Sequence, residues 1–185
     1  MSLIKLSILS FVVSFVGITA KANSISLKET LDRSKYNVFF LRHALAPGYG
    51  DPTDFNIDDC KTQRNLNSEG KDQARSIGTD LKSIGISFDK IYSSEWCRCT
   101  ETASLLNLGE VTTFSGLNSF FQNHYNREET IAKLMNKLES LDKTGRVLMV
   151  THQVVISAIT GINVASGVAV AYNPSDGSAV KLSMR

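Results

Sequence analysis

Short apolar runs along the chain predict the strands of a mainly parallel sheet. Parallel strands are covered on both faces, so they show nearly continuous apolar residues rather than strict alternation. Such runs occur at 36–41, 89–94, 111–114 and 146–151. The run at 111–114 is expected near the edge of the sheet. The segments 167–172 and 178–183 flank the turn residues Pro174 and Gly177, and this pattern predicts a hairpin.

Polar segments with apolar residues at helical spacing separate the predicted strands. Helices are predicted at 26–33, from Ser68 to Ile84, at 95–106, from Ile131 to Leu141 and at 152–160. We expect Ser68 to cap the second helix and Gly145 to end the fourth. Because strands alternate with helices, the fold class is α/β, a three-layer α/β/α sandwich with a mainly parallel central sheet.

Residues 1–22 show the pattern of a secretory signal peptide. An apolar stretch at 6–18 follows a single lysine, and Ala20 and Ala22 offer the small residues that a signal peptidase recognises. A helix of that length rises about 20 Å, which is short of the roughly 30 Å hydrocarbon core of a bilayer. We therefore predict cleavage after Ala22, export to the periplasm or the medium, and a single domain at 23–185 without a stable membrane span.

The charge of the chain changes once the export signal is set aside. The 185 residues include 20 Lys and Arg against 18 Asp and Glu, a net charge of +2. Lys5 and Lys21 lie in the predicted signal, so the mature chain has 18 residues of each sign. With 42% hydrophobic and 21% charged residues the composition excludes a disordered chain. There is no basic stripe, so no nucleic-acid partner is expected.

The cysteines predict a disulfide in the exported protein. Cys60, Cys97 and Cys99 all lie in the mature part, and an oxidising compartment permits a bridge. We expect Cys60 to pair with Cys97 or with Cys99 and the remaining thiol to be buried. Cys60 lies in a long polar loop, 44–67, of a length typical of functional segments. The cysteines lack metal-ligand spacing, so no metal site is expected.

Positively charged and imidazole side chains follow three of the predicted strands. Arg42 and His43 follow the first, Arg98 lies one helical turn beyond the second, and His152 ends the fourth. The carboxyl ends of parallel strands meet at one edge, where such sheets bind ligands. Guanidinium groups match phosphate oxygens, and a neutral imidazole can act as a nucleophile. These residues predict a phosphate site with a built-in nucleophile, and His124 is given no role.

Four short motifs in this order resemble those of the histidine phosphatase superfamily, which includes the cofactor-dependent phosphoglycerate mutases. They are the Arg-His pair at 42–43, the helix start at 66–74, the Ser-Ser and Arg segment at 93–103 and the Val-Thr-His segment at 150–152. The resemblance therefore covers about residues 40–152 and implies a phosphoglycerate mutase-like fold for the domain 23–185.

The resemblance implies a role for each matching residue. His43 would attack phosphorus and carry the phosphoryl group, and Arg42 and Arg98 would hold the non-bridging oxygens. His152 would complete the phosphate pocket and stabilise the transferring group. Water would then hydrolyse the phosphohistidine, with no metal or other cofactor. The implied activity is that of a metal-independent histidine acid phosphatase-type phosphoric monoester hydrolase acting on a small phosphorylated substrate.

The position of the usual proton donor departs from the family pattern. Many members have Leu-x-Glu where this chain has Leu117, Asn118 and Ser119, and neither of the latter two is a carboxylic acid. We expect Asp51 or Asp54, in the loop near His43, to supply the proton, ahead of the acids at 128–129. The same departure favours a phosphatase over a mutase.

The chain lacks the signatures of other phosphatase and hydrolase classes. No cysteine stands six residues before an arginine, and neither a phosphate-binding G-x-x-x-x-G-K-[ST] loop nor a G-x-S-x-G elbow occurs. Cysteine phosphatases, P-loop enzymes and serine hydrolases are therefore not supported. The alternative is a catalytically weak or inactive module of the same fold that binds phosphate or a sugar phosphate, as Ser119 in place of the acid would suggest.

Overall fold

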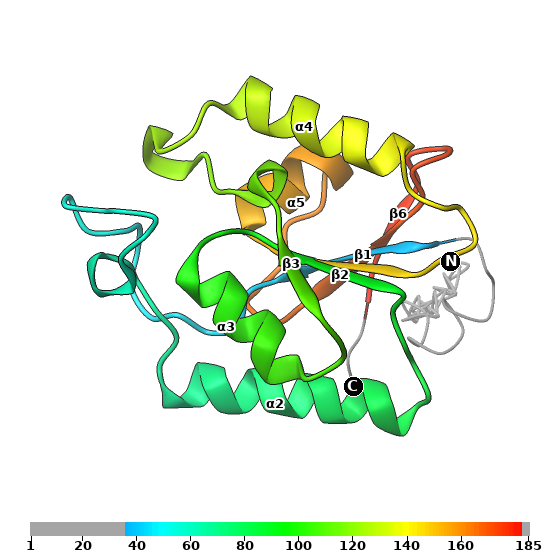
Figure 1. Ribbon diagram of the computed structural model, residues 1–185, viewed down its shortest axis with the longest axis horizontal. Helices are drawn as coiled ribbons and strands as arrows, with labels where there is room; N and C mark the ends of the chain where they lie inside the picture. Colours follow the sequence, from blue (N-terminus) through cyan, green and yellow to red (C-terminus); the bar gives the residue numbers. More distant parts are fainter. Residues whose placement is uncertain (1–35, 183–185) are drawn as a thin grey trace, which may run out of the picture.

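The computed structural model describes residues 36–182 (Figure 1). The predicted export signal at 1–22 and the helix predicted at 26–33 lie outside these residues. Within the described part, no helix is both long enough and apolar enough to cross a bilayer.

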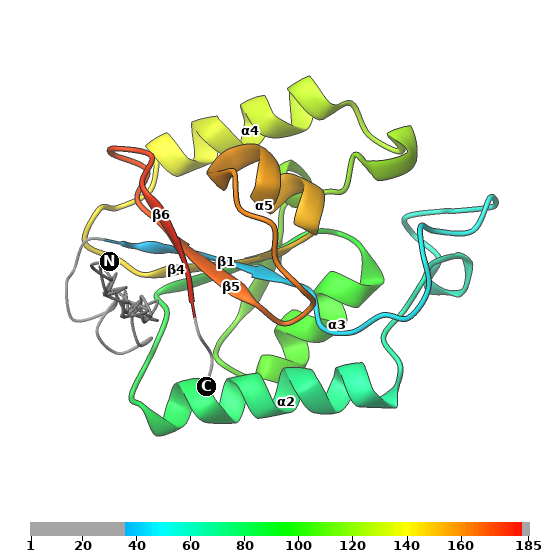
Figure 2. The same ribbon diagram turned by 180° about the vertical axis from the view of Figure 1, so that it is seen from behind.

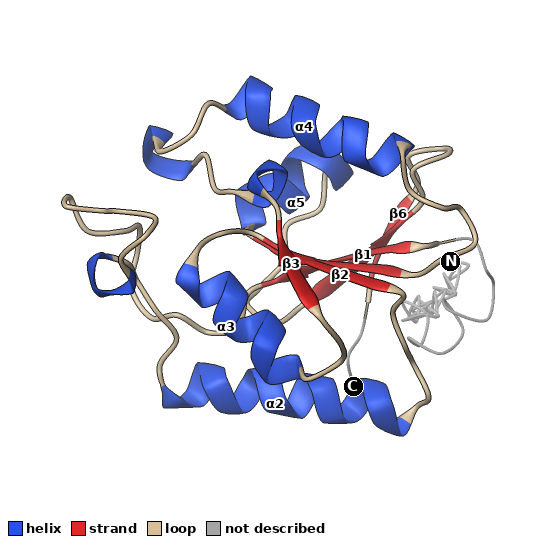
Figure 3. Ribbon diagram, viewed as in Figure 1, coloured by secondary structure: helices blue, strands red, loops and turns tan. Residues whose placement is uncertain are grey.

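A six-stranded sheet forms the middle layer (Figure 3). Its strands are β1 (Val38–Arg42), β2 (Lys90–Ser93), β3 (Val111–Thr113), β4 (Val147–Thr151), β5 (Ala169–Tyr172) and β6 (Ala179–Lys181). The order across the sheet is β3-β2-β4-β1-β5-β6. The first four of these strands run parallel to one another, β5 runs antiparallel to β1, and β6 runs antiparallel to β5. The predicted mainly parallel sheet, the edge position of β3 and the hairpin of β5 and β6 are therefore confirmed.

Two pairs of helices cover the two faces of the sheet (Figure 1). α2 (Ser68–Ser83) and α3 (Cys97–Leu106) lie on one face, and α4 (Arg127–Glu139) and α5 (Gln153–Thr160) lie on the other. Alternate residues of β1 enter the two cores, because successive side chains of a strand point to opposite faces. Phe39 packs in the core under α2 and α3, and Phe40 packs in the core under α4 and α5. The predicted three-layer sandwich is confirmed.

The N-cap of α2 and the end of α4 differ from the predicted ones. Asn67, not Ser68, caps α2, since its side-chain oxygen accepts a hydrogen bond of 2.8 Å from the Gly70 N–H. α4 ends at Glu139, well before Gly145. The cause of the early end is local, because the Asp142 carboxylate accepts hydrogen bonds from the backbone and hydroxyl of Thr144 and so favours a turn over further helix.

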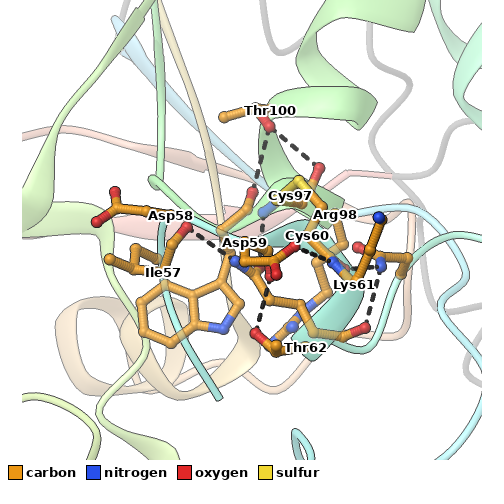
Figure 4. Close-up of a disulfide and its surroundings, with 12 residues drawn as sticks. Ile57, Asp58, Asp59, Cys60, Lys61, Thr62, Cys97, Arg98 and Thr100 are labelled. Atoms are coloured by element: carbon orange, nitrogen blue, oxygen red, sulfur yellow. Dashed lines mark hydrogen bonds between the residues drawn. A yellow bond between two sulfur atoms is a disulfide. The ribbon is translucent and has the colours of Figure 1, made fainter. Parts of the chain in front are cut away.

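A disulfide ties the loop 44–67 to the start of α3. Cys60 pairs with Cys97, the first residue of α3 and the neighbour of Arg98, as Figure 4 shows. Of the two pairings left open by the sequence, the structure has this one. Cys99 is the buried free thiol, because it is turned into the core on the sheet side of α3. The prediction of one bridge plus one buried thiol is confirmed.

Removing this bridge is expected to destabilise the protein. The bridge closes a loop across a sequence separation of 37 residues, and a bridge of this kind contributes about 2–4 kcal/mol by restricting the unfolded chain. We expect the Cys60→Ser/Cys97→Ser double variant to lose about that much unfolding free energy in urea. Reductant should lower the stability of the unsubstituted protein and leave the double variant unchanged. Equal stability of the two proteins without reductant would contradict the prediction.

Candidate active site

A cavity of about 270 Å³ lies at the carboxyl ends of β1 and β4. Its walls include all four residues that the sequence predicted for the phosphate site. The lining consists of Arg42, His43, Gly48, Tyr49, Gly50, Arg64, Arg98, Ser119, Phe121, His152, Gln153 and Val154. The loop 44–67 and the segment 115–126 lie at the same end of the sheet in both views of the molecule (Figures 1 and 2). Both contribute residues to the lining of the cavity.

His43 is held in the form that a nucleophile requires. Its Nδ1 lies 2.8 Å from the Ala44 carbonyl oxygen, which can only accept a hydrogen bond. Nδ1 therefore carries the proton of the neutral ring, and Nε2 keeps its lone pair. Burial, followed by the charge of Arg98, lowers the pKa of His43 to about 3. The ring is thus neutral across the ordinary pH range.

His152 faces His43 across the cavity, with 5.5 Å between the ring centroids. Its Nε2 lies 2.9 Å from the Ser94 hydroxyl, which in turn donates a hydrogen bond to the Asn118 side-chain oxygen. Because that hydroxyl has only one proton, His152 Nε2–H is the donor to Ser94. Burial, followed by the charges of Arg98 and other nearby groups, lowers the pKa of His152 well below its usual value. Nδ1 of this neutral ring faces the Arg98 guanidinium at 3.5 Å.

Arg42 and Arg98 each have a buried Nε–H without a hydrogen-bond partner. Both residues also line the cavity, and guanidinium groups match the oxygens of a phosphate anion. Arg42 is fixed by two hydrogen bonds from its Nη1, 2.7 Å to the Gln153 side chain and 2.8 Å to the Val164 carbonyl. Each guanidinium is therefore held at the cavity wall with donors to spare.

Asp51 forms a buried ion pair with Arg98. The Arg98 guanidinium donates to both carboxylate oxygens, at 2.7 and 3.1 Å, and the side chains of both residues are 3% exposed. Burial would raise the pKa of Asp51, but the hydrogen bonds and charge of Arg98 outweigh it, so this pKa is lowered. Trp96 Nε1–H and the Arg64 N–H also donate to the carboxylate. A carboxylate that is ionised and held by these donors has no proton to give. The prediction that Asp51 is the proton donor is therefore wrong, and Asp51 instead positions Arg98.

Arg64 is a third arginine of the cavity wall, which the sequence motifs did not single out. Its guanidinium donates to the backbone carbonyls of Ala46 and Gly50, so it braces the loop around the cavity mouth. Burial and the charge of Arg98 lower its pKa from the usual arginine value. Arg64 stands two residues before Leu66, the start of a motif segment that leads into α2. That position alone does not place its side chain at the cavity, because the placement depends on the contacts with Ala46 and Gly50.

The motif residues outside the cavity hold the backbone that follows His43. The Gln73 side chain accepts a 2.8 Å hydrogen bond from Leu45 N–H, and the Thr102 hydroxyl accepts one of 3.0 Å from Ala44 N–H. Gly70 lies against the Leu45 carbonyl so closely that a Cβ would stand 1.9 Å from its oxygen. Only glycine fits there, and α2 can therefore begin directly against the strand end that carries His43.

No carboxylate lines the cavity among the described residues. Ser119, at the position where the family pattern has Glu, is buried in the wall, and its hydroxyl accepts a hydrogen bond from the Phe121 N–H. Asp54 is exposed in the loop and does not line the cavity. Glu128 and Glu129 are exposed in the first turn of α4. Within residues 36–182, no cluster of His, Cys, Asp and Glu side chains is arranged to hold a metal.

The buried histidines predict an acid-sensitive fold. Below about pH 6.5 the unfolded chain takes up protons on both rings, whereas folded His43 takes one up only near its pKa of about 3. The unfolding free energy should therefore fall as pH drops from 6.5, by about 1.4 kcal/mol per pH unit for each histidine. Urea unfolding at several pH values measures this slope. The His43→Asn variant should show a shallower slope, and an unchanged slope would contradict the prediction.

Comparison with known proteins places these features in a family. A model of the histidine phosphatase superfamily (branch 1) matches residues 38–125, which include Arg42, His43 and Arg98 but not His152. Comparison with curated proteins finds no significant match. The fold resembles that of the protein histidine phosphatase SixA complexed with tungstate, with a TM-score of 0.53, 16% identity and coverage of 78% of this chain and 92% of that chain. It also resembles the alpha-ribazole phosphatase from Shigella flexneri, with a TM-score of 0.55, 17% identity and coverage of 80% and 96%.

Proposed function

Residues 38–125 belong to the histidine phosphatase superfamily, and from that premise we propose that the protein is a phosphatase that works through a phosphohistidine on His43. The observation that carries the proposal is the state of the His43 ring. Its Nδ1–H is bound to the Ala44 carbonyl and its pKa is about 3, so Nε2 is a free base beside three arginines. The proposed substrate is a phosphomonoester, and the proposed chemistry requires no metal.

The cavity supports a two-step transfer. Nε2 of His43 attacks phosphorus, the bond from phosphorus to the leaving oxygen breaks, and the electron pair of that bond departs with the leaving group. The guanidinium groups of Arg42 and Arg98 stabilise the charge on the non-bridging oxygens. Water then attacks the phosphohistidine, loses a proton to solvent, and releases phosphate and the neutral His43 ring.

His152 is suited to respond to the charge of the bound phosphoryl group. In the absence of an anion its ring is neutral, with Nε2–H donated to Ser94 and Nδ1 without a proton. A phosphate dianion beside Nδ1 favours protonation there, because an opposite charge stabilises imidazolium. The protonated Nδ1 would then donate a hydrogen bond to a phosphoryl oxygen during transfer.

The missing acid limits the leaving groups that the site can handle. A general acid contributes about 10²–10⁴-fold to expulsion of a basic leaving group, and no carboxylic acid of the described residues lines the cavity. We therefore expect esters of acidic alcohols and phenols to react faster than esters of simple alcohols.

Export is the second part of the proposal. The segment 1–22 has the charge, the apolar stretch and the small residues of a signal peptide, and a disulfide at Cys60–Cys97 suits an oxidising compartment. N-terminal sequencing of the mature protein from the periplasm or the medium should begin at Asn23. Recovery of the full chain from the cytosol alone would contradict export.

Ser119 in the cavity wall favours the alternative function, that of a binding module without turnover. Turnover of p-nitrophenyl phosphate distinguishes the proposed enzyme from this binding module. The mature protein should release p-nitrophenol in the presence of a metal chelator and should be inhibited by inorganic phosphate. Phosphate binding measured by calorimetry with no turnover of any phosphoester would support the binding module and contradict the proposed enzyme.

A further inference from the structure

Two aromatic rings stand at the mouth of the cavity. Tyr49 is 87% exposed, and its ring meets that of Phe121 at a centroid distance of 5.2 Å and an interplanar angle of 88°. Both residues line the same cavity as His43 and His152. We call Tyr49 and Phe121 the aromatic rim. An exposed ring that lines the same cavity as His43 differs from an isolated surface residue, because it can contact a group attached to a bound phosphate.

The backbone on both sides of the aromatic rim is fixed. The Gln122 side chain accepts a 2.7 Å hydrogen bond from Asp51 N–H and donates one of 3.3 Å to the Asp51 carbonyl. Gly50, at a φ of +69°, lies against that same amide, where a Cβ would stand 2.6 Å from the Gln122 oxygen. The loop that carries Tyr49 and the segment that carries Phe121 are thus joined next to the rings. The aromatic rim is held by this junction rather than placed by a free loop tip.

The chemistry of the cavity points to the same ligand as the aromatic rim does. Edge-to-face and stacked contacts between flat rings are favourable beyond the area that they bury. A phenol also leaves phosphorus readily as phenolate, because its pKa is about 10, and it therefore needs the missing carboxylic acid least. A flat phenolic group attached to the phosphate would pack against the aromatic rim. It would also leave without help from a carboxylic acid in the cavity.

We propose that the aromatic rim binds the flat ring of the leaving group, so that the preferred substrates are aryl phosphate monoesters. This inference rests on the proposed function for its catalytic part. In the transfer, the bond between phosphorus and the aryl oxygen breaks, its electron pair leaves with the phenolate, and the bond from His43 Nε2 to phosphorus forms. The phenolate takes a proton from water after it leaves.

Binding of two phosphonates that cannot be hydrolysed tests the aromatic rim without turnover. Phenylphosphonate should bind the wild-type protein about fivefold more tightly than methylphosphonate in calorimetry. Tyr49→Ala should remove this preference, and Tyr49→Phe should keep it because the ring remains. Met135→Ala, which removes an exposed apolar side chain on α4 away from the cavity, is the matched control and should leave the preference unchanged. No preference in the wild type, or an equal preference in Tyr49→Ala, would overturn the proposal.

Turnover of two substrates with leaving groups of similar acidity provides the catalytic test. Phenyl phosphate and hexafluoroisopropyl phosphate differ in that only the first carries a flat ring. Tyr49→Ala should lower kcat/KM about fivefold for phenyl phosphate alone, and an equal loss on both substrates would overturn the rim's role. The wild-type protein could prefer phenylphosphonate and yet hydrolyse neither ester. That result would contradict the proposed function and would still support the role of the aromatic rim in binding.

Discussion

Replacing His43 by asparagine should remove turnover of p-nitrophenyl phosphate, by about 10⁴-fold or more, while phosphate still binds. The introduced side-chain amide can still donate to the Ala44 carbonyl, as Nδ1 of the histidine does at 2.8 Å. It cannot supply the Nε2 lone pair that is proposed to attack phosphorus. The arginines of the cavity wall stay in place, so the affinity for phosphate should change little.

Steady-state kinetics and phosphate calorimetry on the same preparation measure the two effects separately. His124→Asn is the matched histidine control, since His124 packs against Phe55 and does not line the cavity; folded His124→Asn should keep its kcat. Turnover of His43→Asn within about tenfold of wild type would show that another group is the nucleophile. Loss of phosphate binding would show instead that His43 also holds the anion.

The second large effect is expected at Arg98. Arg98→Lys keeps a positive charge beside the buried Asp51 carboxylate, so it avoids leaving that carboxylate unpaired. A lysine, however, has no planar fork, and it cannot bind Asp51 with two parallel hydrogen bonds and still present the Nε–H that is unpaired beside the cavity. We expect kcat/KM to fall about 100-fold, the scale of losing one fixed donor to the transferring group.

Arg75→Lys is the matched control for this substitution. Arg75 lies on α2 in an exposed ion pair with Asp72, so the variant should keep full kcat/KM. A loss of less than about threefold in Arg98→Lys would contradict the role given to the guanidinium. A large loss that is reproduced in Arg75→Lys would point to a general effect of the substitution rather than to the site.

The sequence was most informative about parts of the fold that depend on a repeating pattern. β1, β2 and β4 were predictable because both their faces are covered and apolar residues run through them. The convergence of Arg42, His43 and His152 followed from the rule that parallel strands end at one edge. Each of these residues lies at or directly beyond a strand end.

The features that the sequence did not predict correctly depend on contacts between segments far apart in the chain. Asp51 was predicted as a proton donor because it lies near His43 in sequence, but its carboxylate reaches Arg98, 47 residues away. Arg64 was missed because its place in the wall depends on how the loop folds back onto Ala46 and Gly50. The choice of Cys97 over Cys99 depends on the side of α3 that faces the sheet. None of these contacts has a period that the sequence displays.

The aromatic rim shows the same limit in another form. Tyr49 and Phe121 lie far apart in the chain, and neither belongs to a repeating apolar pattern. Their meeting depends on the hydrogen bonds between Gln122 and the Asp51 backbone. The proposed specificity therefore depends on loop geometry, whereas the positions of Arg42, His43 and His152 depend mainly on strand ends.

The central claim is that His43 carries the phosphoryl group, and trapping that group tests it most directly. The mature protein is mixed with ³²P-labelled p-nitrophenyl phosphate, quenched with base within milliseconds, digested and mapped by mass spectrometry. We expect a label on the peptide that contains His43. This label should be stable in base, lost in acid and absent from His43→Asn. Continued turnover with no label on His43, or with the label on another residue, would contradict it.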